Sequence, residues 1–165
     1  TLRTKSALQV ISEMAKVPGA VVGAGTITQS NDIKDAINAG ASFAVSPGVT
    51  DTILEESERH NLAIMPGAAT PSEIMRLFEF GYSVQKFFPA EANGGRAALK
   101  AISGPLPNVK FCPTGGINCD NAEGYLELEN TLCVGGSWVA TQKLIENKDW
   151  RTIHDLAKKA SILVS

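Results

Sequence analysis

The chain alternates short apolar runs with longer amphipathic segments. Six runs are mainly apolar rather than strictly alternating between apolar and polar positions: Ala20–Thr26, Ala41–Ser46, Leu62–Met65, Ser83–Phe88, Val109–Cys112 and Thr131–Val134. Continuous apolar runs are typical of parallel strands that are covered on both faces. The segments between them have the period of amphipathic helices. The pattern therefore predicts a series of parallel βα units.

Start and stop signals support the helices between these runs. Thr70 is followed by a proline and then by Glu73, which is the pattern of an N-cap with a capping box. Ser30 is predicted to cap the next helix upstream, and Gly40 to end it. Asp149 is predicted to cap the last helix of the chain.

Small residues follow every one of the six runs. They form equivalent loops at Gly23–Thr26, Ser46–Gly48, Pro66–Gly67, Pro89–Glu91, Pro113–Gly116 and Gly135–Ser137. A (β/α)₈ barrel builds its active site from such a ring of loops, whereas a dinucleotide-binding fold concentrates its glycines after the first strand. We therefore predict an α/β fold of the (β/α)₈ TIM-barrel type, with six of the eight strands recognisable.

The first residues of the chain match a loop and helix that would follow an earlier strand of the barrel. Thr1 is followed within a few residues by a predicted helix at Lys5–Lys16, which is the order of a loop that follows a strand. We expect residues 1–165 to form a single barrel domain. We also expect a strand–helix–strand segment of about 40 residues to precede Thr1 in the natural protein.

Composition and charge exclude several classes of function. The 165 residues are 44% hydrophobic, and 15 basic residues nearly balance 17 acidic ones, so a nucleic-acid partner is not expected. No apolar run approaches the length of about 20 residues that spans a bilayer, and no signal-peptide pattern opens the chain. Cys112, Cys119 and Cys133 lack metal-ligand spacing, so we predict no metal. We predict free thiols in a reducing cytoplasm, with Cys112 and Cys133 buried.

Lys86 is the candidate nucleophile. It lies in the run Ser83–Phe88, and only one other lysine, Lys110, lies in a predicted strand. Apolar neighbours such as Phe87 and Phe88 remove water and disfavour the charged amine. A lysine with a lowered pKa can attack a carbonyl carbon. Strand lysines more often protect an edge or cover apolar surface, so this interpretation depends on the rest of the chain.

Two glycine pairs predict a phosphate site. Gly115 and Gly116 follow the seventh strand in barrel numbering, and Gly135 and Gly136 follow the eighth, directly before Ser137. Barrels frequently bind phosphate between these two loops. Glycines let backbone N–H groups approach an anion, and a serine adds a hydroxyl donor.

Several segments together resemble the 2-keto-3-deoxy-6-phosphogluconate (KDPG) aldolase family. The resemblance follows the chain in order, and its most specific part is the ten residues from Lys86; the matching segments are Thr1–Thr4, Val22–Thr26, Ser46–Gly48, Met65–Thr70, Lys86–Gly95, Phe111–Ile117 and Gly135–Trp138. The resemblance implies a metal-free class I aldolase without a cofactor. It also implies a (β/α)₈ homotrimer of the Entner–Doudoroff pathway.

The same resemblance implies roles for individual residues. Lys86 forms a Schiff base with the keto acid, Arg3 holds its carboxylate, and Thr26 assists there. Phe88 lines the pocket beside the imine, and Thr114 lies near the reacting carbon. The phosphate is bound by Gly115, Gly116 and Ser137. The family's catalytic glutamate falls two residues before the position of Thr1, so this sequence lacks it, and Glu91 is not assigned its role.

Other readings remain open at this level. A 2-keto-3-deoxy-6-phosphogalactonate aldolase or a 4-hydroxy-2-oxoglutarate (KHG) aldolase would use the same lysine. A sugar-phosphate isomerase or epimerase would share the phosphate loops without an imine, and so would a phosphate-binding domain without catalysis.

The acidic residues Glu55, Glu56 and Glu58 are predicted to form a solvated helix face. The two histidines, His60 and His154, are expected at the surface.

Overall fold

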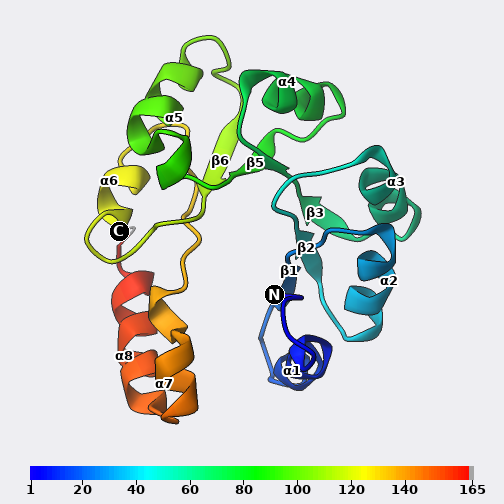
Figure 1. Cartoon of the computed structure of the whole chain (residues 1–165), viewed down its shortest axis with the longest axis vertical. Coiled ribbons are helices and arrows are strands. Elements are labelled where there is room, and N and C mark those ends of the chain that lie inside the picture. The colour runs from blue at the N-terminus through cyan, green and yellow to red at the C-terminus, as the bar shows by residue number, and fades with distance from the viewer. Residues whose placement is uncertain (164–165) are drawn as a thin grey trace. The chain divides into compact units, whose positions relative to one another are not determined.

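The computed structural model describes residues 1–163, and the chain divides into two compact units (Figure 1). Unit 1 comprises Thr1–Lys86, and unit 2 begins at Phe87. Strand β5 (Val84–Phe87) carries the boundary between them. Each unit is described by itself below.

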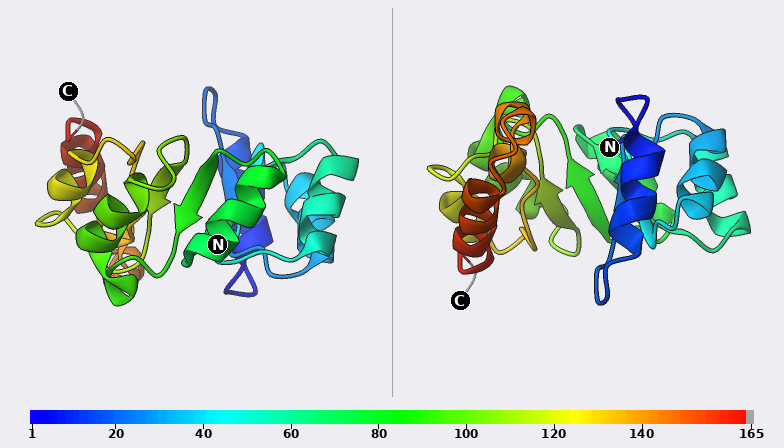
Figure 2. Two further views of the ribbon diagram at one scale, coloured as in Figure 1. Left: turned by 90° about the horizontal axis from the view of Figure 1, so that it is seen from above. Right: turned by 90° about the horizontal axis from the view of Figure 1, so that it is seen from below.

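Unit 1 contains three consecutive parallel βα units. Its sheet has the order β1-β2-β3, and Ala24, Ala44 and Ile64 lie side by side in its register. Figure 2 shows helices α2 and α3 side by side along this sheet. The elements are α1 (Ala7–Ala15), β1 (Gly23–Gly25), α2 (Ser30–Asn38), β2 (Phe43–Val45), α3 (Asp51–Arg59), β3 (Ala63–Met65), β4 (Gly67–Ala68) and α4 (Pro71–Glu79). The parallel arrangement predicted for the first three runs is confirmed.

Small residues on the strands bring the helices of unit 1 close to the sheet. Ala24 and Ala44 are completely buried, as are Ile33 and Ala36 on α2. Gly23 has no room for a side chain, because a Cβ atom there would overlap the ring of Phe43. Burial of these apolar groups stabilises the unit by about 25 cal/mol for each Å² removed from water.

The predicted helix caps are right in two cases out of three. Thr70 Oγ1 accepts a hydrogen bond from the N–H of Glu73 at 3.4 Å, and Glu73 Oε2 accepts one from the N–H of Thr70 at 2.9 Å. Asp149 Oδ1 accepts from the N–H of Thr152 at 3.1 Å. Ser30 is instead the first residue of α2, and its neighbour is the N-cap. The reason is that the Asp32 carboxylate reaches back to the preceding N–H groups, and a charged acceptor makes the stronger bond.

Unit 2 begins on strand β5 and consists mainly of helices. Phe87 and Phe111 are fully buried and meet edge to face, with 6.1 Å between their ring centroids. Figure 1 shows α7 and α8 side by side at the end of the chain. The elements are η1 (Glu91–Asn93), α5 (Gly95–Ser103), β6 (Lys110–Pro113), α6 (Ala122–Leu126), η2 (Trp138–Ala140), α7 (Gln142–Glu146) and α8 (Trp150–Ser161).

The strands differ from the predicted six at two places. Residues 131–134 make no strand. Two isolated parallel bridges lie here instead: Thr131 pairs with Phe111 of β6, and Gly135 pairs with Thr114, directly after β6. One extra residue lies on the 131–135 side between these bridges, and such an insertion interrupts a ladder. The short strand β4, in unit 1, was not predicted.

Within residues 1–163, no helix is both long and apolar enough to cross a bilayer. The helix α8, whose apolar positions share a stripe, has no buried residue among those described.

Candidate functional site

Lys86 is held in place by the strand around it. Its backbone N–H donates to the carbonyl of Pro66 at 2.8 Å, and its side chain is half-buried. Its neighbour Gln85 is fully buried, and Gln85 Nε2 donates to the carbonyls of Ile74 at 3.1 Å and Tyr82 at 2.8 Å. These bonds fix the strand, and with it the starting point of the lysine side chain.

The surroundings of Lys86 differ in part from the sequence prediction. Side chains alternate between the two faces of a strand, and in β5 the fully buried residues are Gln85 and Phe87. Phe87 therefore lies on the face opposite Lys86, and it was wrong to count it among the groups that surround the amine. Val84 is half-buried on the same face as the lysine.

Arg3 and Thr26 lie at the carboxyl end of β1. The N–H of Leu2 donates to the carbonyl of Gly25 at 2.8 Å, which brings the start of the chain beside this strand end. Thr26 has a φ of 65°, in the left-handed region that a β-branched residue rarely adopts. Such strain costs of order 1–3 kcal/mol and tends to occur at functional sites. Arg3 is exposed to solvent.

In unit 2, Thr114 lies at the end of β6. Its N–H donates to the carbonyl of Phe87 at 3.0 Å, and its Oγ1 donates to the carbonyl of Cys112 at 3.3 Å. Gly135 packs directly against it, since a Cβ atom there would lie 2.5 Å from Thr114 Oγ1. Gly135 belongs to the second of the two glycine pairs from which a phosphate site was predicted.

Gly115 and Gly116 form a loop with open N–H groups. Their φ angles are 98° and 83°, which only glycine adopts without strain. The carbonyl of Gly115 accepts from the N–H of Glu91 at 3.1 Å, and that of Gly116 accepts from Asn121 Nδ2 at 3.0 Å. Among residues 1–163, no group accepts a hydrogen bond from the N–H of either glycine. Successive N–H groups of this kind can bind an anion.

Ser137 and Phe88 are the two remaining candidate residues of unit 2. The bridge between Thr114 and Gly135 brings the segment before Ser137 alongside the glycine loop. Ser137 is exposed at the start of η2. A Cβ atom at Gly115 would lie 3.3 Å from ring atoms of Phe88, so the loop packs on this ring.

The cysteines depart from the prediction. All three are free, but Cys133 is exposed and Cys112 is half-buried. A hydrogen bond with Cys112 lowers the pKa of Cys133 to about 7, against an opposing effect of burial. Cys133 was predicted to be buried because its apolar neighbours suggested a central strand, and that strand does not form.

The candidate site residues are therefore found at strand ends in both units. Arg3, Thr26 and Lys86 belong to unit 1. The other five belong to unit 2: Phe88, Thr114, Gly115, Gly116 and Ser137. That all eight line one pocket stays a prediction. Sequence reasoning missed two residues, Asn121, which is the N-cap of α6, and Tyr125, which lies within α6; nothing in the sequence pattern marks them.

Comparisons with known proteins agree with one another. A sequence model of the family "KDPG and KHG aldolase" matches residues 1–156. The 2-dehydro-3-deoxy-phosphogluconate aldolase of Pseudoalteromonas atlantica is 49% identical over 161 residues, which cover 97% of this chain and 75% of the relative. The KHG/KDPG aldolase of Escherichia coli K12 is 45% identical, with 97% and 76% covered.

Solved structures of similar fold are also KDPG aldolases. The KDPG aldolase of Legionella pneumophila, which was captured with pyruvate as a covalent carbinolamine intermediate, has a TM-score of 0.93 and 44% identity, with 96% of this chain and 78% of that one covered. The Zymomonas mobilis ZM4 enzyme with 3-phosphoglycerate has a TM-score of 0.91 and 43% identity, with 98% and 76% covered. The resemblance drawn from the sequence is confirmed: this chain belongs to the KDPG and KHG aldolase family and is an aldolase, a carbon–carbon lyase.

Proposed function

We propose that this aldolase cleaves KDPG to pyruvate and glyceraldehyde 3-phosphate through an imine on Lys86. The observation that carries the proposal is the position of Lys86. It is half-buried in β5, a strand that its own backbone bond and the side-chain bonds of Gln85 hold in place. A fixed amine gains most of its advantage from being aligned with the carbonyl that it attacks. The family relatives support the reaction class.

The mechanism begins when the neutral amine of Lys86 adds to C2 of the keto acid. Loss of water from the carbinolamine gives a protonated imine, which acts as an electron sink. A base removes the C4 hydroxyl proton, and the electrons of the C3–C4 bond move into the imine. Glyceraldehyde 3-phosphate leaves. The remaining enamine takes up a proton at C3, and hydrolysis releases pyruvate and regenerates Lys86.

The other residues are proposed to bind the substrate. The planar guanidinium of Arg3 suits a bidentate pair with the carboxylate of the keto acid. Thr26 is proposed to assist at that carboxylate, since its strained backbone suits a functional position. Thr114 is proposed to lie near the reacting carbon, and Phe88 to line the pocket beside the imine.

The phosphate group is proposed to bind at the glycine loop. Gly115 and Gly116 present N–H groups that make no hydrogen bond within the described part of the chain, and Ser137 adds a hydroxyl. This loop acts on a part of the substrate distant from the bond that breaks. Its binding energy therefore positions the substrate rather than stabilising the new charge.

Borohydride trapping with pyruvate tests the imine. Reduction followed by digestion and mass mapping is expected to find a pyruvyl adduct on Lys86 and on no other lysine. Lys110, the other strand lysine, donates to the carbonyl of Glu129 at 2.8 Å and serves as the internal control. An adduct on another lysine, or none in natively folded protein, would refute the proposal.

KHG is proposed as a second substrate. The family model and the E. coli relative both carry KHG in their names. KHG lacks a phosphate but offers the same keto acid to Lys86. Comparing cleavage of KDPG, of its C4 epimer and of KHG measures the preference directly.

The finer features of the fold and assembly are also proposals. We infer a single closed (β/α)₈ domain that assembles as a cytoplasmic homotrimer and acts in the Entner–Doudoroff pathway, as the family resemblance implies. The three free thiols suit a reducing compartment. Light scattering of the purified protein measures the oligomeric state, and a mass other than three chains would contradict the trimer.

A further inference from the structure

Tyr125 and Glu91 are joined by a hydrogen bond although they lie 34 residues apart. The Tyr125 hydroxyl donates to Glu91 Oε1. Tyr125 belongs to α6 and is completely buried, while Glu91 opens η1, the short helix after the Lys86 strand. A buried hydroxyl needs a partner, so this bond fixes the direction of the Glu91 side chain.

The Glu91 side chain therefore places its apolar stem and its carboxylate next to different glycines. A Cβ atom at Gly116 would lie 2.5 Å from Glu91 Cγ and 2.8 Å from Glu91 Cβ. A Cβ atom at Gly95 would lie 2.9 Å from the Tyr125 hydroxyl and 3.2 Å from Glu91 Oε1. The apolar stem of Glu91 thus covers Gly116, and its carboxylate lies toward Gly95 and Tyr125.

The backbone of the glycine loop is held by the same two elements. From η1 and the residue before it, the N–H groups of Ala90 and Glu91 donate to the carbonyls of Thr114 at 2.8 Å and Gly115 at 3.1 Å. From the start of α6, Asn121 Nδ2 donates to the carbonyl of Gly116 at 3.0 Å. The carbonyls of Thr114, Gly115 and Gly116 therefore accept hydrogen bonds from the protein. Within the described part of the chain, the N–H groups of the two glycines donate none.

A carboxylate this close to an anion-binding loop is an electrostatic hazard. Left to rotate, it could accept the glycine N–H groups itself or repel a phosphate. Burial, and then the hydrogen bond to Glu91, raise the pKa of Tyr125, so the hydroxyl stays protonated and remains a donor near neutral pH.

We propose that Tyr125 and Glu91 are positioning residues for phosphate recognition. Tyr125 holds the Glu91 carboxylate away from the glycine loop, and the Glu91 stem packs on Gly116 and keeps its N–H group open to a phosphate. This inference rests on the phosphate assignment of the proposed function. It adds a device that tells phosphorylated substrates from unphosphorylated ones.

The test measures phosphate recognition in full-length protein with and without turnover. Tyr125→Phe is expected to weaken binding of inorganic phosphate by about fivefold in calorimetry and to raise KM for KDPG by about the same factor. Its kcat, and its KM for KHG, should stay within about twofold of the parent. Tyr82→Phe, at a half-buried tyrosine in unit 1, is the matched control and should change none of these.

A charge-neutral variant separates this device from simple packing. Glu91→Gln keeps the stem and an oxygen that accepts from Tyr125, so phosphate binding should stay near that of the parent. The double variant Tyr125→Phe with Glu91→Gln should recover most of the lost affinity, because a neutral amide neither repels phosphate nor competes for its donors. If Tyr125→Phe does not fold, Glu91→Asp, with a shorter stem and the same charge, should show the phosphate-specific loss.

Three results would overturn the inference: an equal loss with KDPG and KHG, no change in phosphate affinity, or a double variant as weak as Tyr125→Phe alone. These results are distinct from failure of the proposed function. If the parent protein binds phosphate but does not cleave KDPG, the proposed function is refuted. The positioning role is then still decided by the calorimetric comparison of the variants.

Discussion

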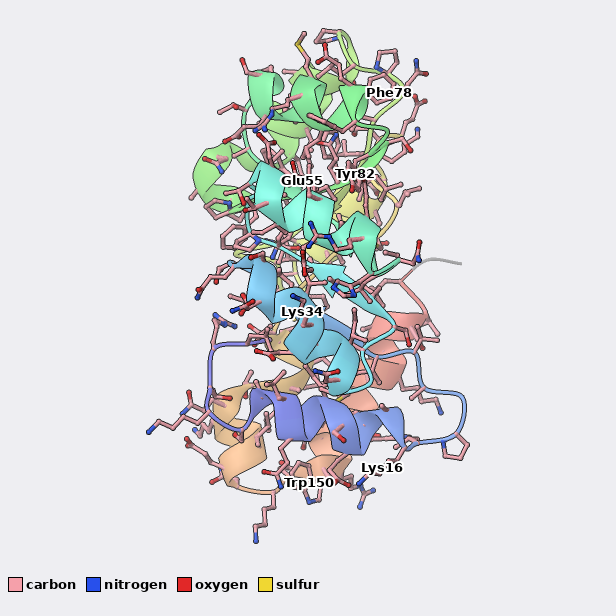
Figure 3. The ribbon with its side chains drawn as sticks, turned by 90° about the vertical axis from the view of Figure 1, so that its right-hand side faces the viewer. Lys16, Lys34, Glu55, Phe78, Tyr82 and Trp150 are labelled. Atoms are coloured by element: carbon pink, nitrogen blue, oxygen red, sulfur yellow. The ribbon has the colours of Figure 1, made fainter. Side chains whose placement is uncertain are left out.

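Lys34 and Glu56 join helix α2 to helix α3, with 3.0 Å between Lys34 Nζ and Glu56 Oε1. The Glu56 side chain is only 10% exposed, and Arg59 and His60 also contact its carboxylate, at 3.1 Å each. Figure 3 shows Lys34 on α2 and Glu55, the neighbour of Glu56, on α3. The prediction that Glu56 belongs to a solvated face was wrong, because it ignored the adjacent helix.

This pairing makes stability depend on pH. The hydrogen bond from Lys34 lowers the pKa of Glu56, burial opposes this, and the charges of Lys34 and Arg59 lower it further. The folded-state pKa lies below the unfolded value of about 4.3, so the stabilisation is present above that pH and is lost as the pH falls through the folded value.

Glu56→Gln should therefore lower the free energy of unfolding at pH 7, and its difference from the parent should shrink below about pH 4. Urea unfolding across this range measures both. Glu55→Gln, at an exposed position of the same helix, is the control and should have little effect. A difference that stays constant down to pH 3 would contradict the pairing.

Thr26→Gly should stabilise the fold while reducing activity. Glycine relieves the left-handed strain of about 1–3 kcal/mol but costs roughly 0.5–1 kcal/mol of backbone entropy, so we expect a net gain of about 1 kcal/mol. Loss of the hydroxyl should lower kcat/KM for KDPG. Urea unfolding and steady-state assays check the two effects, and Thr28→Gly, which follows two residues later, should not stabilise.

Lys86→Ala should lower turnover of KDPG by at least about a thousandfold, because the proposed mechanism requires the amine of Lys86 to form the imine. The variant should also lose borohydride-trapped pyruvate and keep its far-ultraviolet circular dichroism spectrum. Lys110→Ala, at the other strand lysine, should keep both activity and trapping. Activity that survives in Lys86→Ala would disprove the assignment of the nucleophile.

Ser137→Ala should raise KM for KDPG by about fivefold, with little change in kcat, because one ordinary hydrogen bond contributes about 1 kcal/mol to binding. KHG, which has no phosphate, should be cleaved as by the parent. Ser103→Ala, at a serine that donates to the carbonyl of Lys100 at the end of α5, is the control. Equal losses with both substrates would remove Ser137 from the phosphate site.

Local signals in the sequence determined much of the fold. The cap formed by Thr70 and Glu73 needs only residues three apart, and the apolar runs around Ala24, Ala44 and Ile64 needed only their own composition to be recognised. The Lys86 segment and the two glycine pairs were specific enough to identify the family, which the comparisons then confirmed.

Tertiary structure decided what depends on distant partners. The segment 131–134 reads as a strand, but its register against β6 breaks after one bridge, which composition does not encode. Glu55 and Glu56 are neighbours in one helix, and the approach of α2 makes Glu56 a partner of Lys34. Likewise, nothing local links Tyr125 to Glu91. Periodicity and capping act over a few residues, whereas burial and charge pairing exist only once the chain has folded.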